Sequence, residues 1–462
     1  MLTVPLEPPP PIADALRSAA GRRRPILFDS AKRGPTGRWS FLAADPVAVV
    51  ERQTVGPGQT DWLDDLRRWR RAFPTPPSGA PPFAGGVAGV LSYDAGHAFE
   101  RLARPPVDEF AAPAVCCGAY DWVIAWDHAE GTCRLVSTGV TAEGGVSRAV
   151  ARRRADGVLA VLGDRGSASV DDGRPVEPAI AHAVPAFPGV TSNFTPGGYD
   201  EAVEAVRRHI AAGDIFQANL AQRLVTAATR PPVEEYLRLR EVNAAPMAGY
   251  FDAGDWQLLS ASPERFLELS PAGRVETRPI KGTLKRPARP EADLYARDAL
   301  RQSEKDRAEN VMIVDLMRND LARVCRPGSV AVPRLCEIET YETVQHLVSV
   351  VAGRLREGTD AFDLLAAAFP GGSITGCPKI RAMDVITALE GVARGPYCGS
   401  LFYASAGGRM DSSILIRSAL RRGGRLAFGV GGGVTYASDA EAEYRETLVK
   451  AEAMVEAFGA GR

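Results

Sequence analysis

A lone lysine, Lys281, has the sequence surroundings expected of a nucleophile. It stands between Pro279 and Gly282, at what we predict to be the end of a strand. Val275 and Thr277 precede it with a period of two, so the ammonium is expected to point to the same side as these inward residues. An amine attacks carbon only in its neutral form, which burial and nearby cations favour. The alternative is an ordinary surface lysine beside a glycine.

Two predicted helices each present a pair of carboxylates on one face. Asp306 and Glu309 lie three residues apart where a strongly apolar helix begins, and Glu443 and Glu446 have the same spacing near the end of the chain. Side chains three or four residues apart share a helix face, and Lys450 lies on the face of Glu446. If the two helices converge, their carboxylates suit a hard divalent ion such as Mg²⁺. The alternative is two solvated helix faces with glutamate–lysine pairs.

Two glycine-rich segments expose backbone amides that can bind an anion. The first, residues 369–379, leads directly into a helix whose first turn suits Pro378. The buried stripe of that helix is expected to comprise Ile380, Met383, Ile386 and Leu389. The second segment, residues 429–434, precedes the acidic helix at the end of the chain. Neither segment has a Walker A or Rossmann motif, so nucleotide binding has no support.

A strand is predicted over residues 215–225. Its apolar face is expected to hold Phe216, Ala218 and Leu220, and its other face presents the amides of Gln217 and Asn219. Buried amides serve as simple hydrogen-bond anchors or as ligand contacts.

Composition excludes several classes of partner and compartment. The 462 residues carry 55 lysines and arginines against 56 aspartates and glutamates, without a long basic run, so nucleic acid is not expected as a partner. The seven cysteines are scattered and never spaced as CxxC, which argues against a disulfide framework or a zinc site and favours the reducing cytoplasm. The first residues lack a secretory apolar region, and no stretch approaches about 20 uninterrupted apolar residues, so no membrane association is expected.

The chain divides into two regions. We expect an N-terminal, strand-rich region over residues 1–162, a linker over residues 163–189 and a catalytic region over residues 190–462. The linker is a mixture of glycine, proline, serine and aspartate with little periodicity. The catalytic region opens with a helix in which Tyr199 and Val203 begin an apolar stripe, and Gly213 ends it.

Together and in this order, the motifs resemble the chorismate-utilising enzymes, in particular their aminodeoxychorismate synthase component I branch. The resemblance spans nearly the whole sequence and is carried by residues 27–30, 83–94, 213–220, 262–266, 279–283, 306–309, 343–349, 369–379, 410–417 and 439–450. It implies an α+β chorismate-binding fold with large, mainly antiparallel sheets and helices packed outside them. Anthranilate-forming members usually carry a small residue where Lys281 stands. The implied reaction is therefore amination of chorismate at C4, which gives 4-amino-4-deoxychorismate.

The resemblance implies three catalytic residues. Lys281 would bond covalently to C2 of chorismate, and Glu264 would give a proton to the leaving hydroxyl. His346 lies in an apolar run typical of a core histidine, and its match to the family implies a positioning or electrostatic role. Mg²⁺ would be bound by Glu309 and Glu446 directly, with Asp306 and Glu443 assisting.

The resemblance also implies a set of substrate contacts. Tyr397 and Arg417 would hold the enolpyruvyl carboxylate, for which a guanidinium is apt. The full set of implied substrate-binding residues is Gln217, Thr375, Tyr397, Arg417, Gly431, Gly432, Gly433 and Lys450. Isochorismate and salicylate synthases place a lysine base where Gln217 stands, so hydration at C2 is not expected.

Ammonia must come from another protein. No GxCxG elbow with a suitable histidine and glutamate is present, so the resemblance implies a separate glutamine amidotransferase subunit. The alternatives are anthranilate synthase component I and a catalytically silent tryptophan-binding regulatory subunit, although the latter predicts decayed acidic positions. Ser30 lies in a segment that resembles the tryptophan pocket of related enzymes, where tryptophan would be structural, inhibitory or absent. The sequence does not indicate whether the product enters folate or a specialised metabolite.

Overall fold

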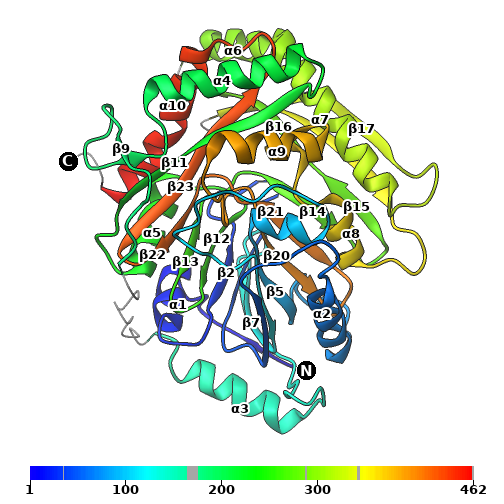
Figure 1. Ribbon diagram of the computed structural model, residues 1–462. Helices are drawn as coiled ribbons and strands as arrows, with labels where there is room; N and C mark the ends of the chain where they lie inside the picture. The colour runs from blue at the N-terminus through cyan, green and yellow to red at the C-terminus, as the bar shows by residue number, and fades with distance from the viewer. Residues whose placement is uncertain (35, 164–174, 287–288, 341–343, 460–462) are drawn as a thin grey trace.

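The computed structural model describes residues 1–34, 36–163, 175–286, 289–340 and 344–459 (Figure 1). No helix among these residues is long and apolar enough to cross a membrane. All seven cysteines are free, and all except Cys377 are buried.

Two large sheets organise the chain, and all strand pairings that the described residues form within them are antiparallel. The first sheet has 13 strands: β1 (Leu2–Pro5), β2 (Ile26–Asp29), β3 (Trp39–Ala43), β7 (Trp122–Asp127), β8 (Thr132–Ser137), β9 (His182–Ala183), β10 (Thr191–Ser192), β11 (Gln217–Ala227), β12 (Ala248–Asp252), β13 (Gln257–Ser260), β19 (Gly376–Cys377), β22 (Ser418–Arg422) and β23 (Arg425–Val434). The second has 10 strands: β4 (Ala48–Arg52), β5 (Gly86–Leu91), β6 (Val115–Tyr120), β14 (Arg265–Leu269), β15 (Arg274–Thr277), β16 (Ile280–Lys285), β17 (Ala331–Thr340), β18 (Val344–Arg354), β20 (Ser400–Ser405) and β21 (Met410–Ile414).

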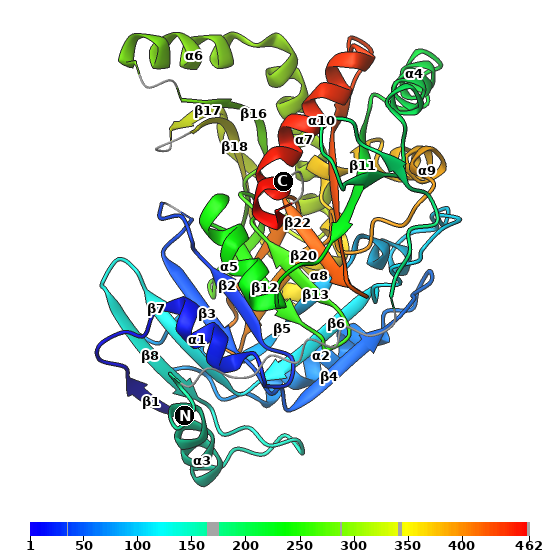
Figure 2. The ribbon, with the colours of Figure 1, turned by 90° about the vertical axis from the view of Figure 1, so that its left-hand side faces the viewer.

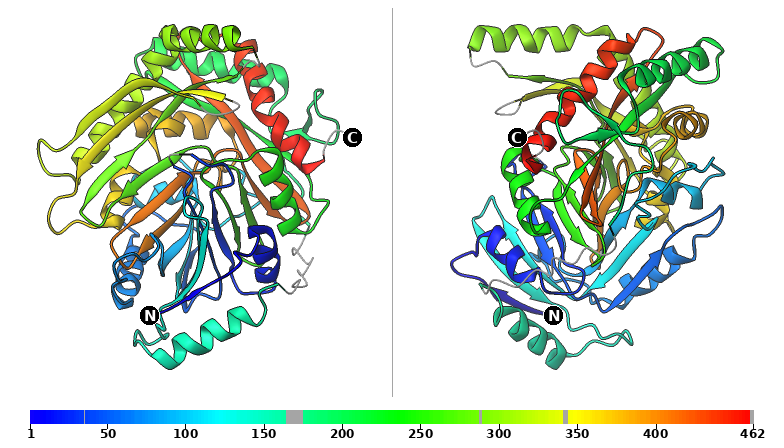
Figure 3. Two further views of the ribbon diagram at one scale, coloured as in Figure 1. Left: turned by 180° about the vertical axis from the view of Figure 1, so that it is seen from behind. Right: turned by 60° about the vertical axis from the view of Figure 1, so that its left-hand side comes forward.

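Most helices pack outside the sheets, as Figures 2 and 3 show. They are α1 (Ile12–Ala19), α2 (Asp61–Ala72), α3 (Arg148–Leu159), α4 (Pro196–Ala211), α5 (Pro232–Val242), α6 (Pro290–Gln302), α7 (Glu304–Ala322), α8 (Ala361–Ala368), α9 (Lys379–Glu390) and α10 (Ala440–Phe458), with two short 3₁₀ turns, η1 (Tyr93–Ala98) and η2 (Gly372–Ile374). Helices α4 and α9 pack on β11, α10 packs on β23, and α7 packs on β18. The predicted α+β fold with large antiparallel sheets is confirmed.

Side-chain caps fix where the site-bearing helices begin. Ser303 accepts a hydrogen bond from the Asp306 amide and starts α7, and Asp439 accepts one from the Ala442 amide and starts α10. Each cap satisfies one backbone donor that the first helical turn leaves free, typically worth about 1 kcal/mol. The two acidic pairs therefore lie within the first two turns of well-defined helices.

The N-terminal and catalytic regions share both sheets, and in each sheet the strands of the N-terminal region form one block beside those of the catalytic region. Strand β2 pairs with β12, and β5 pairs with β20. The division at residues 163–189 stays a prediction, because residues 164–174 lie outside the described chain. Part of the remainder, His182–Ala183, forms β9 at the edge of the first sheet.

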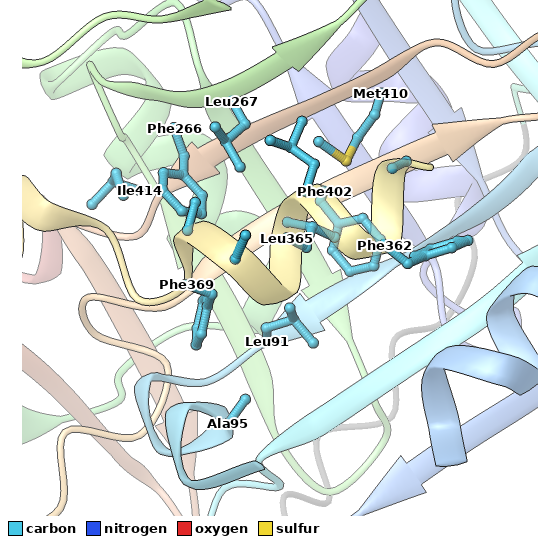
Figure 4. Close-up of a cluster of buried hydrophobic side chains, with 14 of the residues drawn as sticks. Leu91, Ala95, Phe266, Leu267, Phe362, Leu365, Phe369, Phe402, Met410 and Ile414 are labelled. Carbon is cyan, nitrogen blue, oxygen red and sulfur yellow. The ribbon is translucent and has the colours of Figure 1, made fainter. Parts of the chain in front are cut away.

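Helix α8 lies among a cluster of buried hydrophobic side chains (Figure 4). Phe362 and Leu365 on α8 share one core cluster with Phe266, Phe369 and Phe402, and all five side chains are buried. Burying each such side chain contributes about 1.5–3 kcal/mol relative to leaving it exposed. Because Phe266 belongs to the strand that directly follows Glu264, this cluster fixes the backbone that carries the expected general acid.

Two predictions of buried apolar residues are wrong. Phe216 is 69% exposed, because β11 begins only at Gln217 and the amide of Phe216 donates to the Cys377 carbonyl at 2.7 Å. Ile380 is 42% exposed, because the buried face of α9 starts one residue pair later, at Ala382 and Met383. Both exposed side chains lie at the same end of β11.

Candidate active site

The structure places Lys281 on the inward face of the second sheet. Strands β15 and β16 keep one register along β18, with Thr277 opposite Val351 and Ile280 opposite Val348. Lys281 therefore lies on the same side as the buried Thr277, as predicted. Its side chain is 14% exposed, and its Nζ lies 3.8 Å from Glu309 Oε2 on α7.

The glycine after Lys281 allows α7 to approach this closely. The ladder shifts register between Lys281 and Thr283, and Gly282 takes a φ of 68°. A Cβ at Gly282 would lie 2.6 Å from Leu300 Cδ1 and 3.0 Å from Asp306 Cγ. Positive φ and this contact both require glycine, which bends the strand and aims Lys281 at the start of α7.

Glu264 has the environment of a general acid. It is 5% exposed, and burial raises its pKa to about 7 against the opposing effects of Ser373, Lys281 and the Ile280 amide. The carboxyl therefore keeps its proton over a neutral pH range in which an ordinary glutamate is ionised.

The pKa of Glu264 predicts the alkaline limb of the activity profile. A general acid acts only while protonated, so turnover at saturating ammonia is expected to fall as pH rises through about 7. In Glu264→Gln the remaining activity should be far lower and should lose this limb. A pH profile of kcat/KM for chorismate checks this, and an unchanged limb in Glu264→Gln would assign it to another group.

Three carboxylates and three ammonium groups alternate in the centre of the site. The pairs are Lys281 with Glu309 at 3.8 Å, Lys305 with Glu443 at 2.9 Å and Lys450 with Glu446 at 2.6 Å. Burial raises the pKa of Glu309. The charges of Asp306 and Glu443 add to this rise, and the charges of Lys281 and Lys305 oppose it. Burial alone would raise the pKa of Glu446, but Lys450 lowers it below its usual value. The three glutamates therefore form an anionic cluster whose negative charge must be neutralised by cations.

The carboxylates converge on a stretch of backbone without side chains. A Cβ at Gly432 would lie 3.3 Å from Glu443 Oε2 and 3.4 Å from Glu446 Oε1, and one at Gly433 would lie 3.1 Å from Glu309 Oε2. No group of three or more acidic, histidine or cysteine side chains in the described ranges is spaced to hold a metal ion. The donor chemistry of the three glutamates nevertheless suits Mg²⁺ once the lysines move aside. Asp306 lies at the margin, where it accepts a hydrogen bond from Ser303 and faces Gly282.

The positive charge of Arg417 has no ion-pair partner among the described residues. It adopts a φ of 50°, and its guanidinium makes no hydrogen bond or ion pair with a described residue. Burial lowers the pKa of Arg417. Burial likewise lowers the pKa of His346 to about 4, with the charges of Arg417 and Lys32 adding to the effect. His346 is therefore neutral at pH 7 beside a cation suited to a carboxylate.

The remaining expected substrate contacts line the end of β23. Tyr397 lies against Gly429, where a Cβ would come within 2.3 Å of the ring, and Lys450 donates to the Gly431 carbonyl at 2.8 Å. Gln217 lies over Gly433 with its Nε2 1.9 Å from where a Cβ would stand. Glycines at these positions leave the room that the neighbouring side chains occupy.

Thr375 belongs to the turn rather than to an open surface. Its side chain is fully buried and donates to the Gly371 carbonyl at 3.0 Å, while its own carbonyl accepts from the Asn219 amide at 2.7 Å. The hydroxyl thus fixes the glycine-rich turn against β11.

Two residues that contribute to the site received no role from the sequence. Ser373 hydrogen bonds to Glu264, and Lys305 pairs with Glu443. Lys305 could have been identified from the sequence, because it lies four residues before Glu309 on the same helix face. Nothing local in the sequence connects Ser373 with Glu264.

Ser30 lines a separate cavity of about 320 Å³ between the two sheets. Its hydroxyl donates to the Trp39 carbonyl at 2.7 Å, and Phe28, Phe41 and Tyr403 form aromatic walls. Tryptophan at this cavity stays a prediction.

Known chorismate enzymes are similar to this chain along most of its length. A family model described as chorismate binding enzyme matches residues 24–456. The chain is 39% identical over 428 residues to aminodeoxychorismate synthase component 1 of Salmonella typhimurium, covering 90% of this chain and 88% of that protein. It is also 39% identical over 440 residues to anthranilate synthase component 1 of Streptomyces coelicolor, covering 92% of this chain and 81% of that protein.

Solved structures show the same fold. Anthranilate synthase component I from Streptococcus pneumoniae matches with a TM-score of 0.77 and 31% identity, covering 92% of this chain and 93% of that one. The menaquinone-specific isochorismate synthase from Escherichia coli matches with a TM-score of 0.72 and 16% identity, covering 99% and 94%. From these matches, the chain belongs to the family of chorismate-binding enzymes.

Proposed function

We propose that this protein aminates chorismate at C4 to give 4-amino-4-deoxychorismate. The observation that carries the proposal is Lys281, which lies 3.8 Å from Glu309 and close enough to Glu264 for its charge to act on that carboxyl. Relatives named for aminodeoxychorismate synthase and for anthranilate synthase are equally identical to the chain, so the choice between them rests on this lysine.

The proposed reaction has two displacements at the ring. The Nζ of Lys281 bonds to C2, the ring double bond shifts, and the C4–O bond breaks while Glu264 gives its proton to the departing hydroxyl. Ammonia then bonds to C4, the double bond shifts back, and the bond between C2 and Lys281 breaks. The Lys281 nitrogen keeps its protons throughout and leaves with them, and the one proton that the incoming nitrogen loses returns to Glu264, so the net change replaces one hydroxyl by an amino group and releases one water.

Charged residues are available to bind each of the two carboxylates of chorismate. Arg417 and the neutral His346 suit the enolpyruvyl carboxylate, with Tyr397 beside them. Glu309, Glu443 and Glu446 would hold Mg²⁺, which would neutralise the ring carboxylate. Lys305 and Lys450 would then be free to turn from the glutamates toward the anionic substrate.

The ammonia source is proposed to be a separate glutamine amidotransferase. The names of several relatives include "component 1", which implies a second component for those proteins. Glutamine hydrolysis needs a nucleophile with its own base, and six of the seven cysteines here are buried. The purified chain should therefore use ammonium salts and not glutamine until the second subunit is added.

Product identity tests the proposal. The purified protein is incubated with chorismate, Mg²⁺ and an ammonium salt, and the products are separated by chromatography and identified by mass spectrometry. We expect 4-amino-4-deoxychorismate, which a lyase converts to para-aminobenzoate. Accumulation of anthranilate would identify the enzyme as an anthranilate synthase component, and absence of any product would favour the silent regulatory subunit.

A further inference from the structure

Three large apolar side chains are exposed around the start of β11. Phe216, Val311 and Ile380, here called the Phe216 patch, are 69%, 45% and 42% exposed. They come from three separate elements, since Phe216 precedes β11, Val311 lies on α7 and Ile380 lies in the first turn of α9. Exposed apolar residues that gather from different elements are typical of a surface that another molecule covers.

Hydrogen bonds and helix packing bring these elements together. The Phe216 amide donates to the Cys377 carbonyl at 2.7 Å, and Arg381 on α9 donates to Asp214 at 3.1 Å. Helix α7 packs against β19, and the charge of Asp315, one turn after Val311, acts on Cys377. Exposed charged side chains lie close in sequence to the apolar ones, namely Asp315, Arg318, Arg381 and Asp214. An apolar centre with a charged rim is the usual anatomy of a protein interface.

Directly behind the patch, Gln217 has an unmet hydrogen-bonding group. Gln217 follows Phe216 in the chain, is 2% exposed and lies over Gly433 in the active site. Its Oε1 is buried and has no hydrogen-bond partner among the described residues. A buried carbonyl oxygen without a donor is unfavourable, so this position favours a ligand that brings N–H groups.

We propose that the Phe216 patch is the docking surface of the ammonia-supplying partner, and that Gln217 Oε1 accepts a hydrogen bond from the incoming ammonia. The inference rests on the proposed function, because that reaction needs a nitrogen nucleophile that this chain does not make. The partner is a glutaminase, in which water hydrolyses the amide of glutamine to glutamate and ammonia. A partner over the patch would release ammonia close to Gln217, which directly follows Phe216 in the chain.

A partner bound to the Phe216 patch would cover only one side of the active site. Helix α9 lies at one edge of the molecule in Figure 2, and α6 lies at the opposite edge. Helix α6 packs on β16 and β18, which carry Lys281 and His346. A partner seated on the α9 side therefore does not cover the α6 side, where these two strands lie.

Charge substitution in the patch tests the docking step. Ile380→Glu and Phe216→Glu should each weaken binding of the purified glutamine amidotransferase subunit by about tenfold or more in calorimetry, and lower glutamine-dependent product formation in parallel. Ammonium-dependent formation in Ile380→Glu should stay within about twofold of wild type, which also shows that the variant is folded. Val146→Glu is the matched control, because Val146 is 53% exposed and precedes α3 at the far end of the molecule.

Two outcomes separate this inference from the proposed function. Unchanged partner affinity and glutamine-dependent turnover in both patch variants would overturn the docking surface, whatever the product. If wild-type protein makes no product from ammonium and chorismate, the proposed function fails, and the calorimetry still decides whether the patch binds the amidotransferase.

Substitution of Gln217 tests the ammonia contact. Gln217→Met removes the carbonyl oxygen at nearly constant volume, and should raise the KM for ammonium about tenfold more than the KM for chorismate. Gln217→Glu keeps an acceptor oxygen and should recover part of the loss. Equal changes in the two KM values, or no recovery in Gln217→Glu, would show that Gln217 only supports the fold around Gly433.

Discussion

Replacement of Lys281 by alanine is expected to lower formation of 4-amino-4-deoxychorismate by about a hundredfold or more. Strand β16 should persist, since its ladder to β18 uses backbone groups, but the amine that bonds to C2 is gone. Direct attack of ammonia at C2 needs no lysine, so the residual chemistry is expected to shift toward anthranilate formation. Chromatography of the products formed from ammonium and chorismate measures both changes.

A second substitution separates the nucleophile from its charge. Lys281→Arg keeps a cation opposite Glu309, but a guanidinium stays protonated and does not attack carbon. It should be as inactive as Lys281→Ala, and recovery of activity would assign Lys281 an electrostatic role. Mass spectrometry of trapped wild-type protein should show a chorismate adduct on Lys281. An unmodified lysine together with full para-product formation by Lys281→Ala would contradict covalent catalysis.

Structural features that depend on residues close together in the chain could be predicted from the sequence. Ser303 and Asp439 have the side chains that cap helices, and α7 and α10 begin directly after them. The period-two pattern before Lys281 gave the correct face, because the register of β15 continues into β16. These features depend on residues within one or two turns of each other, where spacing alone determines geometry.

Features that depend on distant parts of the chain were not predictable from spacing. The raised pKa of Glu264 requires its burial above α8 and its hydrogen bond to Ser373, about a hundred residues away. Alternation placed Phe216 on a buried face, but Phe216 lies just before β11 and none of the described elements covers its side chain. The pairing of β2 with β12 and of β5 with β20, which joins the two regions, is long-range and is not encoded in composition.

Activity is expected to require Mg²⁺, and Glu309→Gln or Glu446→Gln should nearly abolish it. Each change keeps the shape of the side chain and removes one negative charge from the cluster around Gly432 and Gly433. Partners that contact a metal only indirectly already cost about 10- to 100-fold when changed, so loss of a direct ligand should cost at least as much. Titration of the metal-free protein with Mg²⁺ by calorimetry measures binding separately from turnover.

The control for these variants is Glu441→Gln on the same helix, α10. The Glu441 side chain is 75% exposed and, among the described residues, forms an ion pair with Arg445 at 3.6 Å, so its loss should alter Mg²⁺ binding by less than about twofold. Burial disfavours the charged form of Glu309, so the neutral side chain in Glu309→Gln should not impair folding. The unliganded variant should therefore have a normal circular dichroism spectrum, while its affinity for Mg²⁺ falls. Full activity of Glu309→Gln or Glu446→Gln in the presence of EDTA would show that the three lysines, rather than a metal ion, neutralise the acidic cluster during catalysis.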